Sequence, residues 1–151
     1  MKKITKVVLT SFLFIASFTV MRAENAGNAP SNIIDIDKNA FLEKVFNYEK
    51  NTESWVYEGS TPCIISFYAN FCGPCRRLYP TLTEIAREYG DKLIIYRVNV
   101  ETEKELAAAF GIQGIPLLIF VPVKGKPQAV TGILPKENIE NIVNSFLFGI
   151  E

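Results

Sequence analysis

The chain has 151 residues, with 16 Lys and Arg against 16 Asp and Glu, and it contains no histidine. The missing imidazole excludes hydrolases built on Ser–His–Asp or Cys–His, histidine-ligated zinc, blue-copper sites and the usual c-type haem attachment. Four of the basic residues and none of the acids lie in residues 1–23. The remaining 12 basic and 16 acidic residues leave a formal charge of −4, which argues against a nucleic-acid binder.

Residues 1–23 have the pattern of a secretory signal peptide. Three lysines precede an apolar run over residues 7–20, and Ala23 is a small residue at a possible cleavage site. The run is shorter than the roughly 20 residues that a membrane span needs. We therefore expect cleavage, export to the periplasm or the exterior, and no stable membrane insertion afterwards; an uncleaved membrane anchor is the alternative. Residues 24–32 are small and polar and predict a flexible lead, which places the folded domain at 33–151.

Apolar periodicity in the rest of the chain predicts strands that alternate with helices. The first half of this region predicts a strand at 33–36, a helix capped by Asn39 and reaching Phe46, a polar loop at 51–62, a buried strand at 63–68 and a helix at 72–89 stopped by Gly90. The second half predicts a strand at 93–100, a helix capped by Thr102 and reaching Phe110, and a hairpin of strands at 117–121 and 128–133. A last helix is expected from Pro135, with Ile139, Ile142, Val143, Phe146, Leu147 and Ile150 on one face. This order predicts an α/β fold with parallel strands joined by crossover helices and an antiparallel hairpin at one edge.

The segment with the clearest chemistry is Phe71-Cys72-Gly73-Pro74-Cys75-Arg76, at the junction between a predicted strand and a predicted helix. The first turn of a helix offers unpaired backbone N–H groups and a partial positive charge. A thiolate on Cys72 is stabilised there, so we expect its pKa to fall below the free value of about 8.5. Cys75 lies one turn further on, where it can meet Cys72, and Pro74 costs little within a first turn.

A pair of cysteines at this spacing has other possible uses. Half of a four-cysteine zinc site requires a second pair, and Cys63 is the only other cysteine, so we expect no metal. A purely structural disulfide is possible in an exported protein, but so short a loop closes little chain entropy. A redox-active Cys72–Cys75 pair is therefore the preferred interpretation.

Residues 64–80, IISFYANFCGPCRRLYP, resemble the active-site segment of thioredoxins. The resemblance continues at VNVE (98–101), GIQGIP (111–116) and Gly132, and more loosely before residue 64. It implies the thioredoxin fold, a mixed central sheet of about five strands flanked by about four helices. It also implies thiol–disulfide exchange with no cofactor. The polar loop at 51–62 resembles a longer loop that is common in exported bacterial relatives.

The resemblance also implies roles for individual residues. Cys72 is the expected attacking thiolate, which forms a mixed disulfide with the substrate, and Cys75 is the expected buried resolving thiol. Gly73 and Pro74 complete the active-site motif.

Three further positions are expected near these cysteines. Pro116 matches the family's cis-proline beside the disulfide, and Ile115 would offer its backbone N–H and C=O groups to an extended substrate. Phe71 is expected to contribute to the same substrate-binding surface. Pro80 matches the proline that kinks the active-site helix in the family.

The chain departs from the family pattern at several positions. Ser66 stands where a buried aspartate is frequent, and Arg97 stands where a lysine often partners it. Tyr68 and Phe71 replace frequent tryptophans, and Leu117 replaces a common threonine. Serine is no base at neutral pH, so the acceptor of the proton from the resolving cysteine is left open. The simpler interpretation is that this protein dispenses with a costly buried charge.

Cys63 is the odd thiol of the three. It opens a buried-looking strand, and we expect a small packed core residue. A regulatory or intermolecular disulfide is the alternative.

The sequence as a whole predicts an exported thiol–disulfide oxidoreductase that acts mainly as a reductase. Gly-Pro between the cysteines resembles the reducing branch of the family, whereas oxidising relatives usually carry a histidine there, which stabilises the thiolate. The alternatives are a disulfide oxidase or isomerase, and a non-catalytic interaction module of the same fold. The expected partners are disulfide-containing protein substrates and a membrane-bound electron donor, with no nucleic acid, and we expect a monomer.

Overall fold

The computed structural model describes residues 29–150, so the predicted signal peptide and most of the predicted lead lie outside the described residues. The elements are β1 (Ile33–Asp35), α1 (Lys38–Lys44), β2 (Cys63–Tyr68), α2 (Gly73–Tyr89), β3 (Ile94–Asn99), α3 (Lys104–Ala109), β4 (Leu117–Val121), β5 (Gln128–Thr131) and α4 (Lys136–Ile142). A 3₁₀ turn at Gly90–Lys92 follows α2, and a π-helical segment at Val143–Leu147 continues α4. The predicted order of strands and helices is confirmed.

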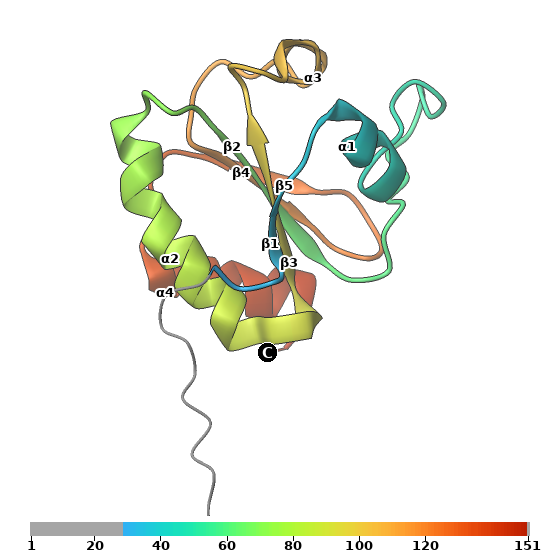
Figure 1. The fold of residues 1–151 in the computed structure, drawn as a ribbon. Coiled ribbons are helices and arrows are strands. Elements are labelled where there is room, and N and C mark those ends of the chain that lie inside the picture. The colour runs from blue at the N-terminus through green and yellow to red at the C-terminus, as the bar shows by residue number, and fades with distance from the viewer. Residues whose placement is uncertain (1–28, 151) are drawn as a thin grey trace, which may run out of the picture.

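The described strands form one mixed sheet in the order β1-β3-β2-β4-β5. β3 pairs in parallel with β1 and β2, whereas β4 pairs antiparallel with β2 and β5. Helices α2 and α4 cover one face of the sheet and α1 and α3 the other (Figure 1). Within residues 29–150 this is the predicted fold, five strands flanked by four helices.

The central strand β2 is buried on both faces, which explains its nearly continuous apolar sequence. Ile64 packs toward α2 and α4, while Ile65 and Phe67 pack toward α1 and α3. Ser66 interrupts this pattern with a side chain that is only 3% exposed. Since side chains alternate along a strand, Ser66 faces the same side as Ile64, under α2.

Two predicted helix caps are wrong, and the structure shows why. Asp37, not Asn39, caps α1, because its carboxylate accepts the backbone N–H of Ala40 at 2.8 Å. Glu103 occupies the cap position of α3 without a side-chain cap bond, while the Thr102 hydroxyl turns back to the Asn99 carbonyl at 3.2 Å.

Glycines end several elements. Gly90 ends α2 with a positive φ of 51°, as predicted. Gly132 has a φ of 100° and donates its N–H to the Pro116 carbonyl at 2.8 Å, so β5 ends at Thr131 rather than at the predicted residue 133. The predicted apolar face of the last helix is wrong at Ile150, because the helical segment ends at Leu147, Gly149 takes a φ of 64° and Ile150 is 60% exposed.

Candidate active site

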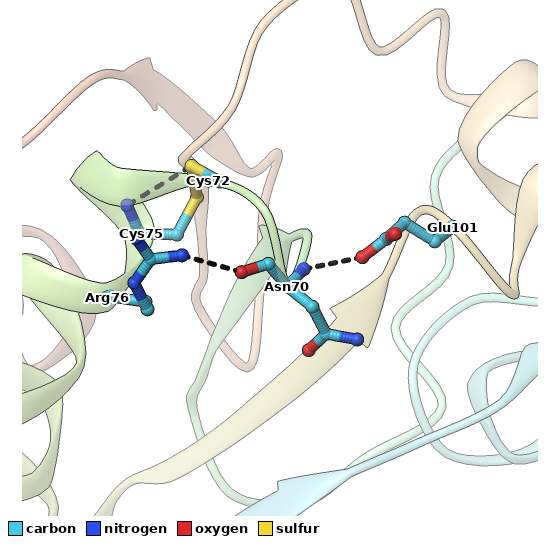
Figure 2. Close-up of a disulfide and its surroundings, with 5 residues drawn as sticks. All are labelled: Asn70, Cys72, Cys75, Arg76 and Glu101. Atoms are coloured by element: carbon cyan, nitrogen blue, oxygen red, sulfur yellow. Dashed lines mark hydrogen bonds between the residues drawn. A yellow bond between two sulfur atoms is a disulfide. The ribbon is translucent and has the colours of Figure 1, made fainter.

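Cys72 and Cys75 lie where β2 gives way to α2, and they are joined by a disulfide with a Cα–Cα distance of 5.2 Å. Cys72 is the cap residue of α2, and its Sγ accepts the backbone N–H of Cys75 at 3.1 Å (Figure 2). Pro74 lies in the first turn, as predicted. The two cysteines are 5% and 8% exposed. The sulfur of Cys72 therefore sits among the free N–H groups at the positive end of a 17-residue helix.

The loop before Cys72 is held from two sides. Arg76 Nη1 donates to the Asn70 carbonyl at 2.8 Å, and the Asn70 N–H donates to the Glu101 carboxylate (Figure 2). These bonds connect the start of α2 to the end of β2 and to the turn after β3. The position of the disulfide is thus fixed by three separate segments of the chain.

The predicted cis-proline is confirmed, since the Ile115–Pro116 peptide bond is cis. Ile115 packs against the small cluster of Ala69, Cys72 and Cys75. The structure thus brings residue 115 to the cysteine pair from a distant part of the chain. Phe71 is 73% exposed and forms an apolar surface directly before Cys72. The roles of these residues in substrate binding stay predictions.

A pocket of about 340 Å³ extends from Cys75 to β3. It is lined by Ser66, Tyr68, Ala69, Asn70, Cys75, Arg76, Tyr79, Leu82 and Arg97. The pocket therefore gathers three of the departures from the family pattern, Ser66, Tyr68 and Arg97, together with the cysteine that is expected to resolve the mixed disulfide.

Arg97 is held in this pocket by aromatic and acidic neighbours. Its guanidinium lies 4.1 Å from the centre of the Tyr68 ring and 4.4 Å from that of Tyr79. Arg97 Nη1 contacts Asp35 Oδ2 at 3.3 Å, and the Tyr68 hydroxyl donates to Asp35 Oδ1 at 3.0 Å. Burial, and next the bond to Asp35, raise the pKa of Tyr68 above its ordinary value, so it stays a neutral donor.

Tyr79 and Asp35 were not singled out by the sequence. Tyr79 follows Cys75 by four residues, so its place on the same face of the helix was readable from the spacing. Asp35 gave no such signal, because its contact with Arg97 depends on the β1–β3 register that makes them partners.

Cys63 is a packed core residue, as predicted. Its side chain is fully buried among the residues between β2 and the α1–α3 layer, and of the three cysteines, all within residues 29–150, it is the one outside the disulfide. Burial raises the pKa of its thiol to about 12, and a hydrogen bond with Tyr57 offsets only part of that rise. Cys63 is thus a neutral thiol, whereas exchange chemistry uses a thiolate.

The family model described as Thioredoxin matches residues 43–145. The chain belongs to the thioredoxin family. It is 38% identical to a protein named Thioredoxin from Borreliella burgdorferi, over 75% of this chain and 96% of that protein. It is 31% identical to Thioredoxin M-type, chloroplastic, from Zea mays, over 93% of this chain and 82% of the relative. A solved structure of chloroplastic thioredoxin z superposes with a TM-score of 0.61 at 23% identity, covering 74% of this chain and 91% of that chain, which shows the fold alone.

Thioredoxins are thiol–disulfide oxidoreductases that act on disulfide-containing proteins, and this family member carries its cysteine pair at the start of α2. In the part of the chain that the structure describes, no group of three or more Cys, Asp and Glu side chains is arranged to hold a metal ion. Across residues 29–150 there is also no helix of the length and apolarity that crossing a bilayer requires.

Proposed function

We propose that this thioredoxin is an exported disulfide reductase that uses the Cys72–Cys75 couple. In the reduced protein, the Cys72 thiolate attacks one sulfur of a substrate disulfide and displaces the other substrate sulfur as a thiolate. The Cys75 thiolate then attacks Cys72 Sγ, and the second substrate sulfur leaves with the electron pair of the broken bond. Two electrons pass to the substrate, both released thiolates take up protons, and Cys72–Cys75 becomes a disulfide.

The observation that carries the proposal is the position of Cys72. Its sulfur accepts a backbone N–H at 3.1 Å at the cap of α2, which is the environment that stabilises a thiolate. Cys75 lies three residues further on in the first turn, and its sulfur is bonded to that of Cys72. The exposed Phe71 and the backbone of Ile115 provide the surface on which an extended substrate segment would lie.

The direction of electron flow follows from what stabilises the thiolate. A histidine between the cysteines would stabilise the reduced form and make the disulfide more oxidising, and this chain has Gly73 and Pro74 there and no histidine anywhere. We therefore expect a reduction potential for the Cys72–Cys75 couple near about −270 mV, measured by equilibration with glutathione. A potential near about −120 mV would instead identify a disulfide oxidase.

The two cysteines have different predicted roles, which trapping can separate. Cys72→Ser should abolish insulin reduction, because no sulfur remains to attack the substrate. Cys75→Ser should accumulate mixed disulfides through Cys72, since nothing resolves them. Trapped partners on Cys72→Ser but not on Cys75→Ser would reverse the assignment.

Export and the domain boundaries rest on the N-terminal sequence. The three lysines, the apolar run over 7–20 and Ala23 support a cleaved signal peptide, a lead at 24–32 and a domain at 33–151. N-terminal sequencing of the protein from its native compartment should begin at Glu24. Recovery of the intact chain in the membrane fraction would show an uncleaved anchor. A reductase outside the cytosol needs renewal of its dithiol, so the proposal includes a membrane-bound electron donor, and light scattering should find a monomer.

A further inference from the structure

The pocket beside the disulfide is lined by both the expected resolving cysteine and an arginine. Ser66 and Arg97 are register partners on neighbouring strands, so their side chains lie on the same face of the sheet, the face that α2 covers. Cys75, Tyr79 and Leu82 follow one another at offsets 0, 4 and 7 and form the face of α2 that meets them. All five residues line the same pocket of about 340 Å³.

The guanidinium of Arg97 is fixed within this pocket rather than free in solvent. Its side chain is 19% exposed and lies against the rings of Tyr68 and Tyr79. Tyr79 is one helical turn from Cys75, and both residues line the same pocket as Arg97.

The charged side chains that line this pocket are Arg76 and Arg97, while the Glu101 carboxylate accepts the N–H of the lining residue Asn70 from outside it. Helix α2 contributes Arg76, which is bonded to the Asn70 carbonyl, and β2 contributes the neutral Tyr68. Asp35 is bonded to Tyr68 and Arg97 but does not line this pocket, and its side chain is 62% exposed. Asp35, Asp37 and Glu103 line a neighbouring pocket that shares Tyr68 and Arg97 as a wall. Among the described residues, no carboxylate lines the pocket that contains Cys75.

We propose that Arg97 is a positioning residue for the resolving step and acts by stabilising the Cys75 thiolate. This rests on the proposed function, which makes Cys75 the resolving thiol. In the mixed disulfide, the Cys75 thiol gives its proton to solvent water, and the Cys75 thiolate formed in the pocket that Arg97 lines attacks Cys72 Sγ. The bond from Cys72 to the substrate sulfur breaks, and that sulfur leaves with the electron pair and takes up a proton from solvent.

An electrostatic role explains why a serine suffices at position 66. A cation that lines the same pocket favours the ionised form of a thiol, so no base has to be buried beside it. A carboxylate at position 66 would partly cancel that field, whereas the small neutral side chain of Ser66 leaves it intact. Asp35 screens Arg97 only partly, because it is largely in solvent.

The first test measures the ionisation of Cys75 directly in a Cys72→Ser background. The rate at which iodoacetamide alkylates Cys75 is followed against pH by mass spectrometry, with Cys63 serving as a buried thiol of pKa about 12 in the same chain. Arg97→Met should raise the midpoint of the pH dependence of Cys75 alkylation, called here the Cys75 midpoint, by about one pH unit. That is the usual effect of removing a neighbouring opposite charge. Arg97→Lys should keep it within a few tenths of a unit. An unchanged midpoint in folded Arg97→Met would overturn the proposal.

A second variant keeps the test decisive if Arg97→Met does not fold. Asp35→Asn retains Arg97 and removes its screening partner from an exposed position, so the Cys75 midpoint should move down. A midpoint that stays or rises would overturn the proposal. The two variants thus shift the same midpoint in opposite directions, which loss of packing alone does not do.

The kinetic test uses a chromogenic aromatic disulfide with the reduced protein. Release of the first thiol reports attack by Cys72, and release of the second reports resolution by Cys75. A rise of one unit in the pKa of Cys75 makes its thiolate about threefold more nucleophilic but, below the Cys75 midpoint, about tenfold less abundant. The Arg97→Met variant should therefore resolve the mixed disulfide about threefold more slowly below that midpoint. Above it, where Cys75 is ionised in both proteins, the variant should resolve about threefold faster. Equal slowing at every pH would show a structural role and contradict the proposal.

The two proposals fail separately. If the wild-type protein does not reduce insulin while the Cys75 midpoint moves as described, the reductase assignment fails and the role of Arg97 stands. If insulin is reduced and neither variant changes the Cys75 midpoint, the reductase assignment stands and the role of Arg97 fails.

Discussion

Replacing Ser66 by aspartate tests how dry and how positive the pocket beside Cys75 is. The new carboxyl would stand at a position that is 3% exposed, opposite Arg97 in the β2–β3 register. Burial raises the pKa of a carboxyl by about 3 to 5 units at most, and a neighbouring cation lowers it by about 1 to 3. Arg97 is already shared with Asp35, so we expect burial to win, with a net rise of about 2 units to a folded-state pKa near 6.

The consequence for stability depends on pH with a definite sign. The unfolded carboxyl ionises near its ordinary pKa of about 3.9, whereas the folded one holds its proton to a higher pH. Stability is therefore full below about pH 4 and falls as the pH rises through the folded-state pKa. For a folded-state pKa near 6, the ionisation costs roughly 1.5 kcal/mol at pH 5 and roughly 3 kcal/mol at pH 8.

The assay is urea unfolding of the oxidised protein at pH 5 and pH 8, with Ser66→Asn as the matched control. Asparagine has the same shape and does not titrate, so the difference in unfolding free energy between the two variants isolates the ionisation. We expect that difference to grow by about 1.5 kcal/mol from pH 5 to pH 8. Equal differences at both pH values would show that position 66 is not dry. An aspartate variant that gains stability toward pH 8 would show that Arg97 outweighs burial.

Three further variants test the core and the helix ends, by denaturant unfolding. Cys63→Ala should cost about 1 kcal/mol through a small cavity and leave insulin reduction unchanged; loss of activity in a folded protein would give Cys63 a redox role. Asp37→Ala should cost about 1 kcal/mol while Asp37→Asn costs little, and equal losses would mean that the cap bond to Ala40 is unimportant. Asn32→Asp should lower the free energy of unfolding by about 2 kcal/mol or more, because the Asn32 Nδ2 lies 2.8 Å from three carbonyls around the end of α2. An unchanged stability would refute that anchoring role.

Much of the fold was readable from the sequence because its periodicities are strong. The run at 63–68 is apolar at nearly every position since β2 is covered on both faces, and Gly90 ends α2 with the positive φ that glycine favours. The caps were less predictable, because Asp37 and Asn39 are both good cap residues and tertiary contacts decide between them. The Glu103 carboxylate accepts the N–H of Lys38 at 2.9 Å, a bond across 65 residues that fixes where the chain enters α1.

The cysteine pair and the cis-proline were predictable because short motifs specify them. The surroundings of Cys75 were not predictable, because they depend on how β1, β3 and α2 pack together. Asp35 reaches Arg97 only through the register of β1 with β3, and Tyr79 reaches it only because α2 lies over that face of the sheet. The sequence shows that Ser66 and Arg97 depart from the family pattern. It does not show that the guanidinium contacts the rings of Tyr68 and Tyr79 in a pocket shared with Cys75.

The same Ser66→Asp variant also separates two accounts of the resolving step, through the rate of mixed-disulfide resolution. If the proton of Cys75 needs a nearby base, the new carboxylate should speed resolution at neutral pH, as the family resemblance implies. If instead the field of Arg97 makes the Cys75 thiolate available, a carboxylate in the pocket cancels part of that field and slows resolution below the Cys75 midpoint, by less than the roughly threefold expected for Arg97→Met. Ser66→Asn changes the shape alone and should leave the rate close to that of the wild-type protein. A faster aspartate variant would therefore count against the role assigned to Arg97, even if the stability measurements behave as expected.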